Sequence, residues 1–405
     1  MGKTKTIFIC SFLFIILSAN PGFPGNFAEI YRSGVDSEES GALDEALIKY
    51  NEALKLAPQS AHAWAKRGEL YLRRGEPKTA IRDLLQAVKL DPAYSAAYTR
   101  LGFAYNAVND YDRAIEALSN AIRLEPTSSE AFNTRGFSYN GKNEYETAIK
   151  DFDKAILLNS NDARYYNNRG FALNGTDQYD KAIEDFDKAI KLDSSNAMFF
   201  NNRGVAYMRL KQFNKAIQDF DKSIDLNSNF SSSYHNKGMA LSGLGRHDKA
   251  VEEFSKVIEM NPNSPVLYKD RGTAYLKLNE YELAKNDFEK SIELDKRFAP
   301  AYAALALLYA QSKDDKFRSP SLAKKNAERA VAMSASMAPD MFRGFAEVLW
   351  EIGQNQEAIK TLQKAASLAP SNKDIQELLI KWGASAQDKA DQLSPSIGVP
   401  FSSLW

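Results

Sequence analysis

Small and apolar residues return along this chain at a fixed interval. One alanine recurs every 34 residues, at Ala46, Ala80, Ala114, Ala148, Ala182, Ala216, Ala250 and Ala284, with later copies at Ala323 and Ala358. With this alanine as position 20 of a unit, ten units begin at Phe27, Ala61, Ser95, Ser129, Ala163, Ala197, Ser231, Pro265, Ala299 and Pro339. A period of this length is typical of repeat architectures, in which each unit is one supersecondary element.

The pattern inside each unit predicts two helices. Position 4 is large, position 8 is mostly glycine and position 11 is often tyrosine, as in Trp64, Gly68 and Tyr71. The spacing i, i+4, i+7 places these residues on one face of a helix, and the alanine and a mostly aromatic position 24 mark a second helix. Glycine inside a helix costs about 1 kcal/mol against alanine, so its recurrence indicates that the two helices approach closely. Proline at position 32, as in Pro92, ends the second helix.

These residues resemble the tetratricopeptide repeat family. Its positions are occupied within one unit by Trp64, Gly68, Tyr71, Ala80, Leu84, Ala87 and Pro92, and the resemblance covers about residues 27–371. It implies an all-α fold, a right-handed α-solenoid of helix-turn-helix tetratricopeptide repeats.

The domain organisation follows from where the repeats begin and end. We predict a signal peptide or anchor at 1–22, ten repeats at 27–371, a capping helix at 372–382 and a disordered tail at 383–405. An insertion at 311–322 is either a partner contact or a tolerated surface loop. The apolar tip of the tail, residues 400–405, is either a docking motif or a segment that folds back into the groove.

The N-terminus has the residue pattern of an export signal. Lys3 and Lys5 precede an apolar run at residues 7–17, which is typical of a signal peptide and short for a membrane span. We expect cleavage after Ala19 or Gly22 and an exported protein, in the periplasm, a secretory lumen or the extracellular space. The alternative is a membrane anchor through residues 7–17. The only cysteine, Cys10, lies in this run, so a cleaved chain forms no disulfide.

Charge and composition argue against several functions. The chain has 52 basic and 52 acidic residues, and a net charge of zero gives no electrostatic footprint for nucleic acid. Its three histidines lack metal-ligand spacing, and we find no catalytic or cofactor motif, so we expect no enzyme, metal or cofactor. Aspartate pairs such as Asp185 and Asp187 are interpreted as surface groups paired with neighbouring lysines such as Lys188. The glycosylation sequons at Asn174 and Asn229 are either used in a eukaryotic secretory pathway or arise by chance.

The resemblance also implies a ligand-binding groove. In the family, positions 2, 5, 6, 9, 12 and 13 of the first helices point into a concave surface. Here they carry an asparagine ladder and a row of phenylalanines: Asn133, Asn140, Asn167, Asn168, Asn201, Asn202, Asn236, Phe103, Phe137 and Phe171. Amide groups suit a peptide backbone, and exposed phenylalanines would form apolar pockets. The asparagines are equally explained as family consensus, and the argument for the phenylalanines fails if packing buries them.

The predicted function is therefore protein binding. We expect a non-enzymatic scaffold that binds an extended peptide or a partner protein in the groove, in the assembly of a complex outside the cytosol. Alternatives are a membrane-anchored assembly factor and a non-catalytic regulatory subunit of an enzyme. The carboxylate clamp of chaperone adaptors is disfavoured, because Lys269 at position 5 is followed by Thr273 where the clamp needs asparagine. We expect no nucleic acid and, for a cleaved chain, no membrane partner; the oligomeric state is left open.

Overall fold

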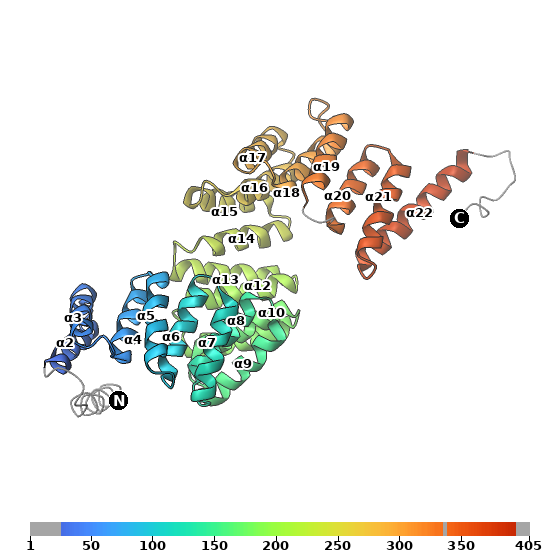
Figure 1. Ribbon diagram of the computed structural model, residues 1–405. Helices are drawn as coiled ribbons and strands as arrows, with labels where there is room; N and C mark the ends of the chain where they lie inside the picture. The colour runs from blue at the N-terminus through green and yellow to red at the C-terminus, as the bar shows by residue number, and fades with distance from the viewer. Residues whose placement is uncertain (1–25, 335–337, 394–405) are drawn as a thin grey trace. The chain divides into compact units, whose positions relative to one another are not determined.

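The computed structural model describes residues 26–334 and 338–393, with side chains as far as Gly383. These residues form helices α2 to α22, and the described residues contain no strand (Figure 1). The predicted signal segment at 1–22 and the end of the tail at 394–405 lie outside them. By its internal contacts the chain divides into two compact units, Met1–Ala206 and Tyr207–Trp405, which are described separately below.

The first helix of each repeat is 13 residues long and begins at the predicted start of a unit. These helices are α2 (Phe27–Glu39), α4 (Ala61–Arg73), α6 (Ser95–Ala107), α8 (Ser129–Gly141), α10 (Ala163–Gly175), α12 (Ala197–Arg209), α14 (Ser231–Gly243), α16 (Pro265–Lys277), α18 (Ala299–Gln311) and α20 (Pro339–Glu351).

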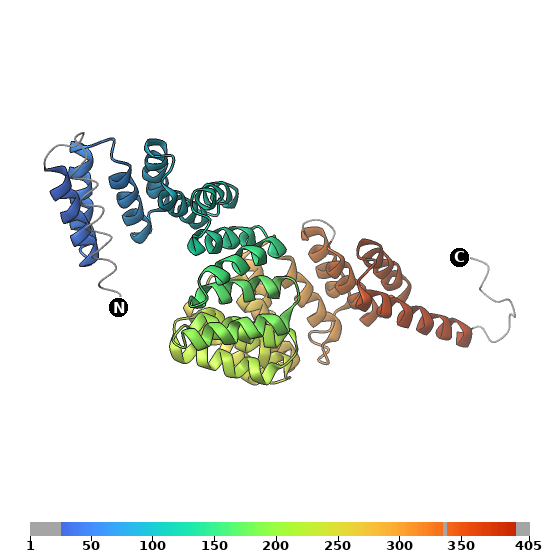
Figure 2. The ribbon, with the colours of Figure 1, turned by 90° about the horizontal axis from the view of Figure 1, so that it is seen from below.

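The second helix of each repeat is 14 residues long and packs against the first. These helices are α3 (Leu43–Leu56), α5 (Pro77–Leu90), α7 (Tyr111–Leu124), α9 (Tyr145–Leu158), α11 (Tyr179–Leu192), α13 (Phe213–Leu226), α15 (His247–Met260), α17 (Tyr281–Leu294), α19 (Pro320–Met333) and α21 (Asn355–Leu368). Within the first unit, successive first helices α4, α6, α8 and α10 also touch one another. Figure 2 shows the helices of this unit, coloured blue to green, from below. The fold class predicted from the sequence, a solenoid of helical hairpins, is confirmed.

The small and aromatic residues that recur in each repeat form the core of each hairpin. A Cβ added to Gly136 would lie 2.7 Å from the ring of Phe152, and one added to Gly170 would lie 2.8 Å from the ring of Phe186. Both rings are fully buried, as is the alanine at position 20, for example Ala182. The glycine at position 8 is therefore required because the second helix places an aromatic ring against the first helix.

The turn between the two helices of a repeat uses a left-handed backbone residue. At position 15, φ is +85° at Gly41, 60° at Asn143 and 58° at Lys211. Glycine adopts this conformation without steric cost and asparagine tolerates it, whereas a lysine there is strained. The glycine or asparagine at position 15 therefore has a conformational reason.

The aspartate pairs of the second helices bind arginines of the first helices, not the neighbouring lysines that we predicted. Arg169 donates from Nε and Nη2 to the two carboxylate oxygens of Asp185, at 2.7 and 2.6 Å. Its Nη1 donates to Asp153 of the preceding repeat at 2.6 Å, and Arg203 donates to Asp187 in the same way at 2.6 Å. Each such arginine therefore joins its own hairpin to the preceding one.

The same bridge recurs in other repeats. In each case a basic residue of the first helix contacts a carboxylate of its own hairpin and a polar side chain of the preceding hairpin. The other examples are Arg67 with Asp83 and Asn51, Arg135 with Asp151 and Ser119, Lys237 with Glu253 and Asp221, and Arg271 with Asp287 and Ser255. A charged residue on the first helix is thus part of the scaffold in both units.

The capping helix and the insertion interrupt the regular pattern of the repeats. The capping helix α22 (Lys373–Leu393) is longer than expected, so residues 383–393, predicted as disordered tail, are helical. Its Trp382 stacks on Trp350 of the last repeat, with ring centroids 4.5 Å apart. The insertion lies in the loop of residues 312–319, within the predicted range 311–322. This loop packs on α17: Phe317 is buried, and the Tyr281 hydroxyl accepts a hydrogen bond from the Lys313 amide at 3.0 Å.

Candidate ligand-binding face of the first helices

The first helices α6, α8 and α10 lie side by side in the first unit. Residues at one position of successive repeats therefore form rows across these helices. We call the surface formed by Phe103, Phe137 and Phe171 the phenylalanine row.

The phenylalanine row remains exposed. Phe103 is 44% exposed, and Phe137 and Phe171 are each 48% exposed. By contrast, Phe132 on the same helix as Phe137 is buried in the core. The exposure on which the sequence argument depends is therefore present, because position 9 faces away from the second helix and position 4 faces the core.

A small residue follows each ring of the row one helical turn later. These residues are Ala107, Gly141 and Gly175, and all three are exposed. A Cβ added to Gly175 would lie 2.7 Å from the ring of Tyr145 in the preceding hairpin. The ring of Tyr145 therefore fills the space over Gly175, and a glycine is needed beside Phe171.

The asparagine ladder is mostly buried between the first helices. Asn133, Asn140, Asn167 and Asn201 are 5 to 9% exposed, whereas Asn168 and Asn202 are half-buried. Asn168 donates to Asn133 Oδ1 at 2.9 Å, and Asn202 donates to Asn167 Oδ1 at 2.9 Å.

These hydrogen bonds tie each first helix to the next. They agree with the alternative explanation of the asparagines, in which they are family consensus residues and not ligand-binding residues. Asn236 is half-buried and lies in the second unit. That the asparagines bind a ligand stays a prediction, and the phenylalanine row is the better-exposed part of the candidate site.

A further asparagine belongs to this ladder and was missed in the sequence. Asn106 on α6 donates to the Thr134 carbonyl at 3.3 Å and accepts a hydrogen bond from Ser138 Oγ at 2.8 Å. Asn140 makes the equivalent bond, to the Asn168 carbonyl at 3.3 Å, but its Oδ1 has no partner in the described structure. The signal was available, since Asn106 occupies the same position 12 as Asn140 and Asn174.

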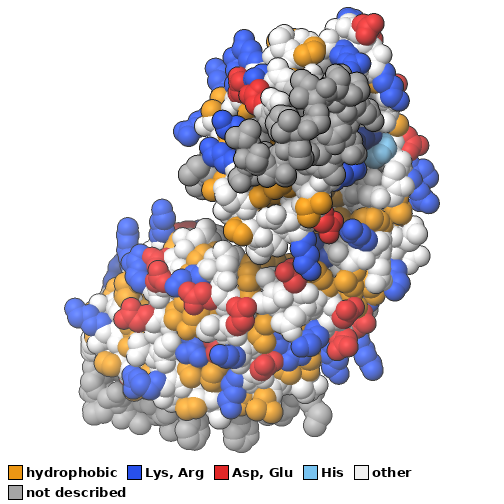
Figure 3. Space-filling view, turned by 90° about the vertical axis from the view of Figure 1, so that its right-hand side faces the viewer, with side chains coloured by type: hydrophobic (Ala, Val, Ile, Leu, Met, Phe, Trp, Pro, Cys, Tyr) orange, Lys and Arg blue, Asp and Glu red, His pale blue; other side chains and the backbone are white. Residues whose placement is uncertain are grey.

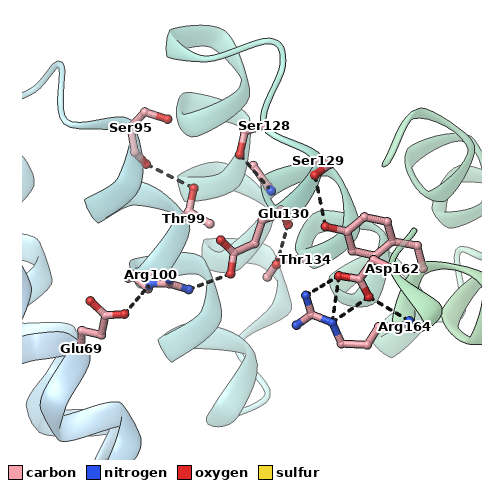
Figure 4. Close-up of polar contacts among 12 residues, drawn as sticks. Glu69, Ser95, Thr99, Arg100, Ser128, Ser129, Glu130, Thr134, Asp162 and Arg164 are labelled. Carbon is pink, nitrogen blue, oxygen red and sulfur yellow. Dashed lines mark hydrogen bonds and ion pairs between the residues drawn. The ribbon is translucent and has the colours of Figure 1, made fainter. Parts of the chain in front are cut away.

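Charged groups beside the row are paired with one another (Figure 4). Arg100 lies between Glu69, at 3.2 Å, and Glu130, at 2.8 Å. Burial lowers the pKa of Arg100, but the two carboxylates outweigh this effect and hold its pKa above the usual value. Arg164 pairs with Asp162 at 2.6 Å. The sequence analysis did not find these contacts, in which each arginine beside the row is paired with a carboxylate.

The second unit carries a different set of exposed residues on its first helices. Met239 and Val266 are 41% and 38% exposed. Beside them, His235 Nε2 lies 2.8 Å from the Asp270 carboxylate, which Lys269 also contacts. Burial raises the pKa of Asp270, but His235 and Lys269 outweigh this effect and lower its pKa below the usual value.

The surface outside these rows is mixed in charge. In Figure 3, Lys and Arg side chains are interspersed with Asp and Glu side chains. Within the described residues there is no group of three His, Cys, Asp or Glu side chains placed to hold a metal ion. None of the described helices combines the length and apolar character needed to cross a membrane.

Known proteins share these repeats. The tetratricopeptide repeat family matches residues 34–97, 95–128, 138–175, 176–211, 197–230, 231–264, 268–298 and 345–372. The chain belongs to the tetratricopeptide repeat family. Proteins of this family bind peptides or other proteins and are generally non-catalytic scaffolds.

Similar solved structures share the repeat fold. A tetratricopeptide repeat protein from Parabacteroides merdae is 18% identical, with 65% of this chain and 100% of that chain covered and a TM-score of 0.52. YrrB, described as a TPR protein with an unusual peptide-binding site, is 25% identical over 47% of this chain and 98% of its own, with a TM-score of 0.39. MamA is 30% identical over 40% of this chain and 94% of its own, with a TM-score of 0.37. The search of curated proteins gives no match.

Proposed function

We propose that this protein is a non-enzymatic scaffold that binds an extended, largely uncharged peptide segment of a partner protein along the phenylalanine row. The observation that carries this proposal is the half-exposure of Phe103, Phe137 and Phe171 on adjacent helices. Fully burying a large apolar side chain contributes about 1.5–3 kcal/mol, so covering the exposed half of each ring contributes about 1 kcal/mol. Three rings in a row favour an extended ligand that contacts several repeats.

The charges around the row support an uncharged ligand. Arg100, Glu130 and Arg164 are each paired with another side chain of the same unit. A charged ligand would have to compete with these pairs, whereas apolar side chains gain from covering the rings. The half-buried amides of Asn168 and Asn202 add neutral polar groups beside the row, which suits a peptide backbone.

We further propose that the protein works outside the cytosol. The support is the basic start and apolar run in residues 1–22, which lie outside the described residues. The mass of the mature protein tests this: loss of the first 19 or 22 residues indicates export with cleavage. A retained segment in a membrane fraction indicates the membrane-anchored assembly factor instead, and an intact chain in the cytosol contradicts the proposal.

Site-specific photocrosslinking tests the binding face. A photoreactive phenylalanine analogue replaces Phe137 in the full chain, and in a control protein it replaces Leu157, which is 77% exposed on the second helix α9. The proteins are expressed in the native host, and crosslinked products are identified by mass spectrometry. We expect a discrete partner at position 137 and none of it at position 157.

A variant with Phe103→Ala, Phe137→Ala and Phe171→Ala then tests whether the rings bind that partner. The rings are half-exposed, so we expect unchanged helicity by circular dichroism and loss of partner capture. The phenylalanines suit this test better than Asn168 and Asn202, whose replacement would also loosen contacts between repeats. Undiminished capture by the triple variant would place the binding site elsewhere.

A further inference from the structure

The last residues of the chain have the chemistry that the phenylalanine row fits. Residues 394–405, Ser-Pro-Ser-Ile-Gly-Val-Pro-Phe-Ser-Ser-Leu-Trp, contain no Asp, Glu, Lys, Arg or His, although 26% of the whole chain is charged. They follow directly on helix α22, which ends at Leu393.

Apolar residues alternate in this segment. Ile397, Val399 and Phe401 stand two residues apart, and Pro395 and Pro400 disfavour a helix. In an extended chain, residues two apart point to the same side, at intervals of about 6.6–6.8 Å. In that conformation the segment would offer a line of apolar side chains, with Gly398 and Pro400 between them and serines on either side.

The row is complementary to such a segment in apolar surface and in charge. Its three rings are half-exposed on adjacent helices, so apolar side chains of an extended segment would cover them. The neighbouring charges of Arg100 and Arg164 are engaged by carboxylates, so an uncharged segment meets no unsatisfied ion. The row therefore suits an apolar segment without charged side chains, and residues 394–405 have that composition.

We propose that residues 394–405 of one copy bind the phenylalanine row of a second copy. The inference rests on the proposed function of the row and names one ligand for it. A second copy can present its C-terminal segment whatever the arrangement of the two units within one chain. The segment then competes with an outside partner for the row and links copies of the protein when they are concentrated.

Binding of the isolated segment is the direct test. A fluorescent peptide of residues 394–405 is titrated with a full-chain variant, Ile397→Ser, Phe401→Ser and Trp405→Ser, in which the protein's own segment no longer competes. Two further proteins add either Phe137→Ala with Phe171→Ala, or Leu157→Ala as a matched surface control. A peptide with Phe401→Asp is the matched ligand control. Fluorescence anisotropy gives the affinity, and circular dichroism shows that the variants are folded.

We expect saturable binding that weakens at least about tenfold when Phe137 and Phe171 are replaced, which corresponds to about 1.4 kcal/mol. Binding should stay within about twofold for Leu157→Ala and weaken about tenfold for the charged peptide. In sedimentation, the unaltered chain should self-associate with rising concentration. The variant with the three substitutions to serine should not.

Three results would overturn this inference: no peptide binding, equal binding to the protein that lacks the two rings, or self-association that is independent of residues 394–405. The proposed function fails separately. If the peptide does not bind but the photoreactive group at position 137 captures another protein, the row is a binding site with a different ligand. If neither occurs, both proposals fail.

Discussion

At the residue scale, neighbouring repeats differ by single polar contacts. Asn106 and Asn140 occupy the same position of successive repeats, and each donates to a carbonyl of the next first helix. Only Asn106 also accepts a hydrogen bond, from Ser138; the equivalent residue facing Asn140 is Ala172, which is fully buried. A buried carbonyl oxygen without a partner, such as Asn140 Oδ1, lowers the stability of the fold, so a new donor at this site should raise it.

Replacing Ala172 with serine should supply the missing bond. We expect Ala172→Ser to stabilise the protein by about 0.5–1.5 kcal/mol, the net contribution of one hydrogen bond, measured as a shift in the denaturation midpoint. Ala104→Ser is the matched control, because this equally buried position faces Leu72, at position 12 of the preceding repeat, and gains no amide partner. Equal effects of the two substitutions would show that the amide is not involved.

At the scale of the helix, charged bridges hold the hairpins in register. Arg169 on α10 binds Asp185 on α11 with two hydrogen bonds and reaches Asp153 on the preceding α9. Asp185 is 6% exposed, and burial raises its pKa above the usual value although Arg169 opposes this effect. The carboxylate therefore depends on the arginine to remain ionised in the packed hairpin.

Removing this arginine should be costly in a way that depends on pH. We expect Arg169→Met to destabilise the protein by about 3–5 kcal/mol at neutral pH, because a buried carboxylate loses its partner. Without the arginine, the pKa of the Asp185 carboxyl in the folded state rises further above its value in the unfolded chain. Protonation therefore favours folding, and the cost shrinks as the pH falls toward about 4.

Two further variants test the cause of this effect, with denaturation curves measured at pH 7 and at low pH. Asp185→Asn in the Arg169→Met background should recover part of the loss, because it removes the buried charge. Arg164→Met breaks an exposed pair and should cost less than about 1 kcal/mol. A loss for Arg169→Met that does not change with pH would contradict the role of the Asp185 charge.

At the scale of the whole molecule, a repeat array is stabilised mainly by contacts between neighbours. In the first unit each hairpin touches the next one along the chain, as α8 and α9 touch α10. A defect in one hairpin should therefore weaken that hairpin and its neighbours more than distant repeats.

Phe186→Ala tests this expectation. The ring is fully buried against Gly170, so its loss leaves a cavity and should cost about 3–5 kcal/mol. Hydrogen exchange should show lost protection in α10, α11 and the adjoining helices, while α2 to α5 keep theirs. Uniform loss across α2 to α11 would indicate that the first unit unfolds as one cooperative block.

The sequence by itself determined the hairpins. Every first helix begins where the 34-residue pattern places it, and Gly170 and Phe186 meet as their spacing predicts. The hairpins could be predicted because the residues that build one hairpin are close in sequence and recur in each repeat. The exposure of Phe137 agrees with the family resemblance, which implies that position 9 of the first helix points away from the core.

Only the tertiary structure decided what the polar residues do between repeats. Asn133 faces Asn168, Arg169 reaches Asp153, and residues 383–393 continue the capping helix. The first two contacts join different hairpins, so they depend on which faces neighbouring helices present to each other. A sequence pattern gives the face of a helix but not the partner that meets it, and the asparagines therefore became part of the scaffold while the phenylalanines stayed open to a ligand.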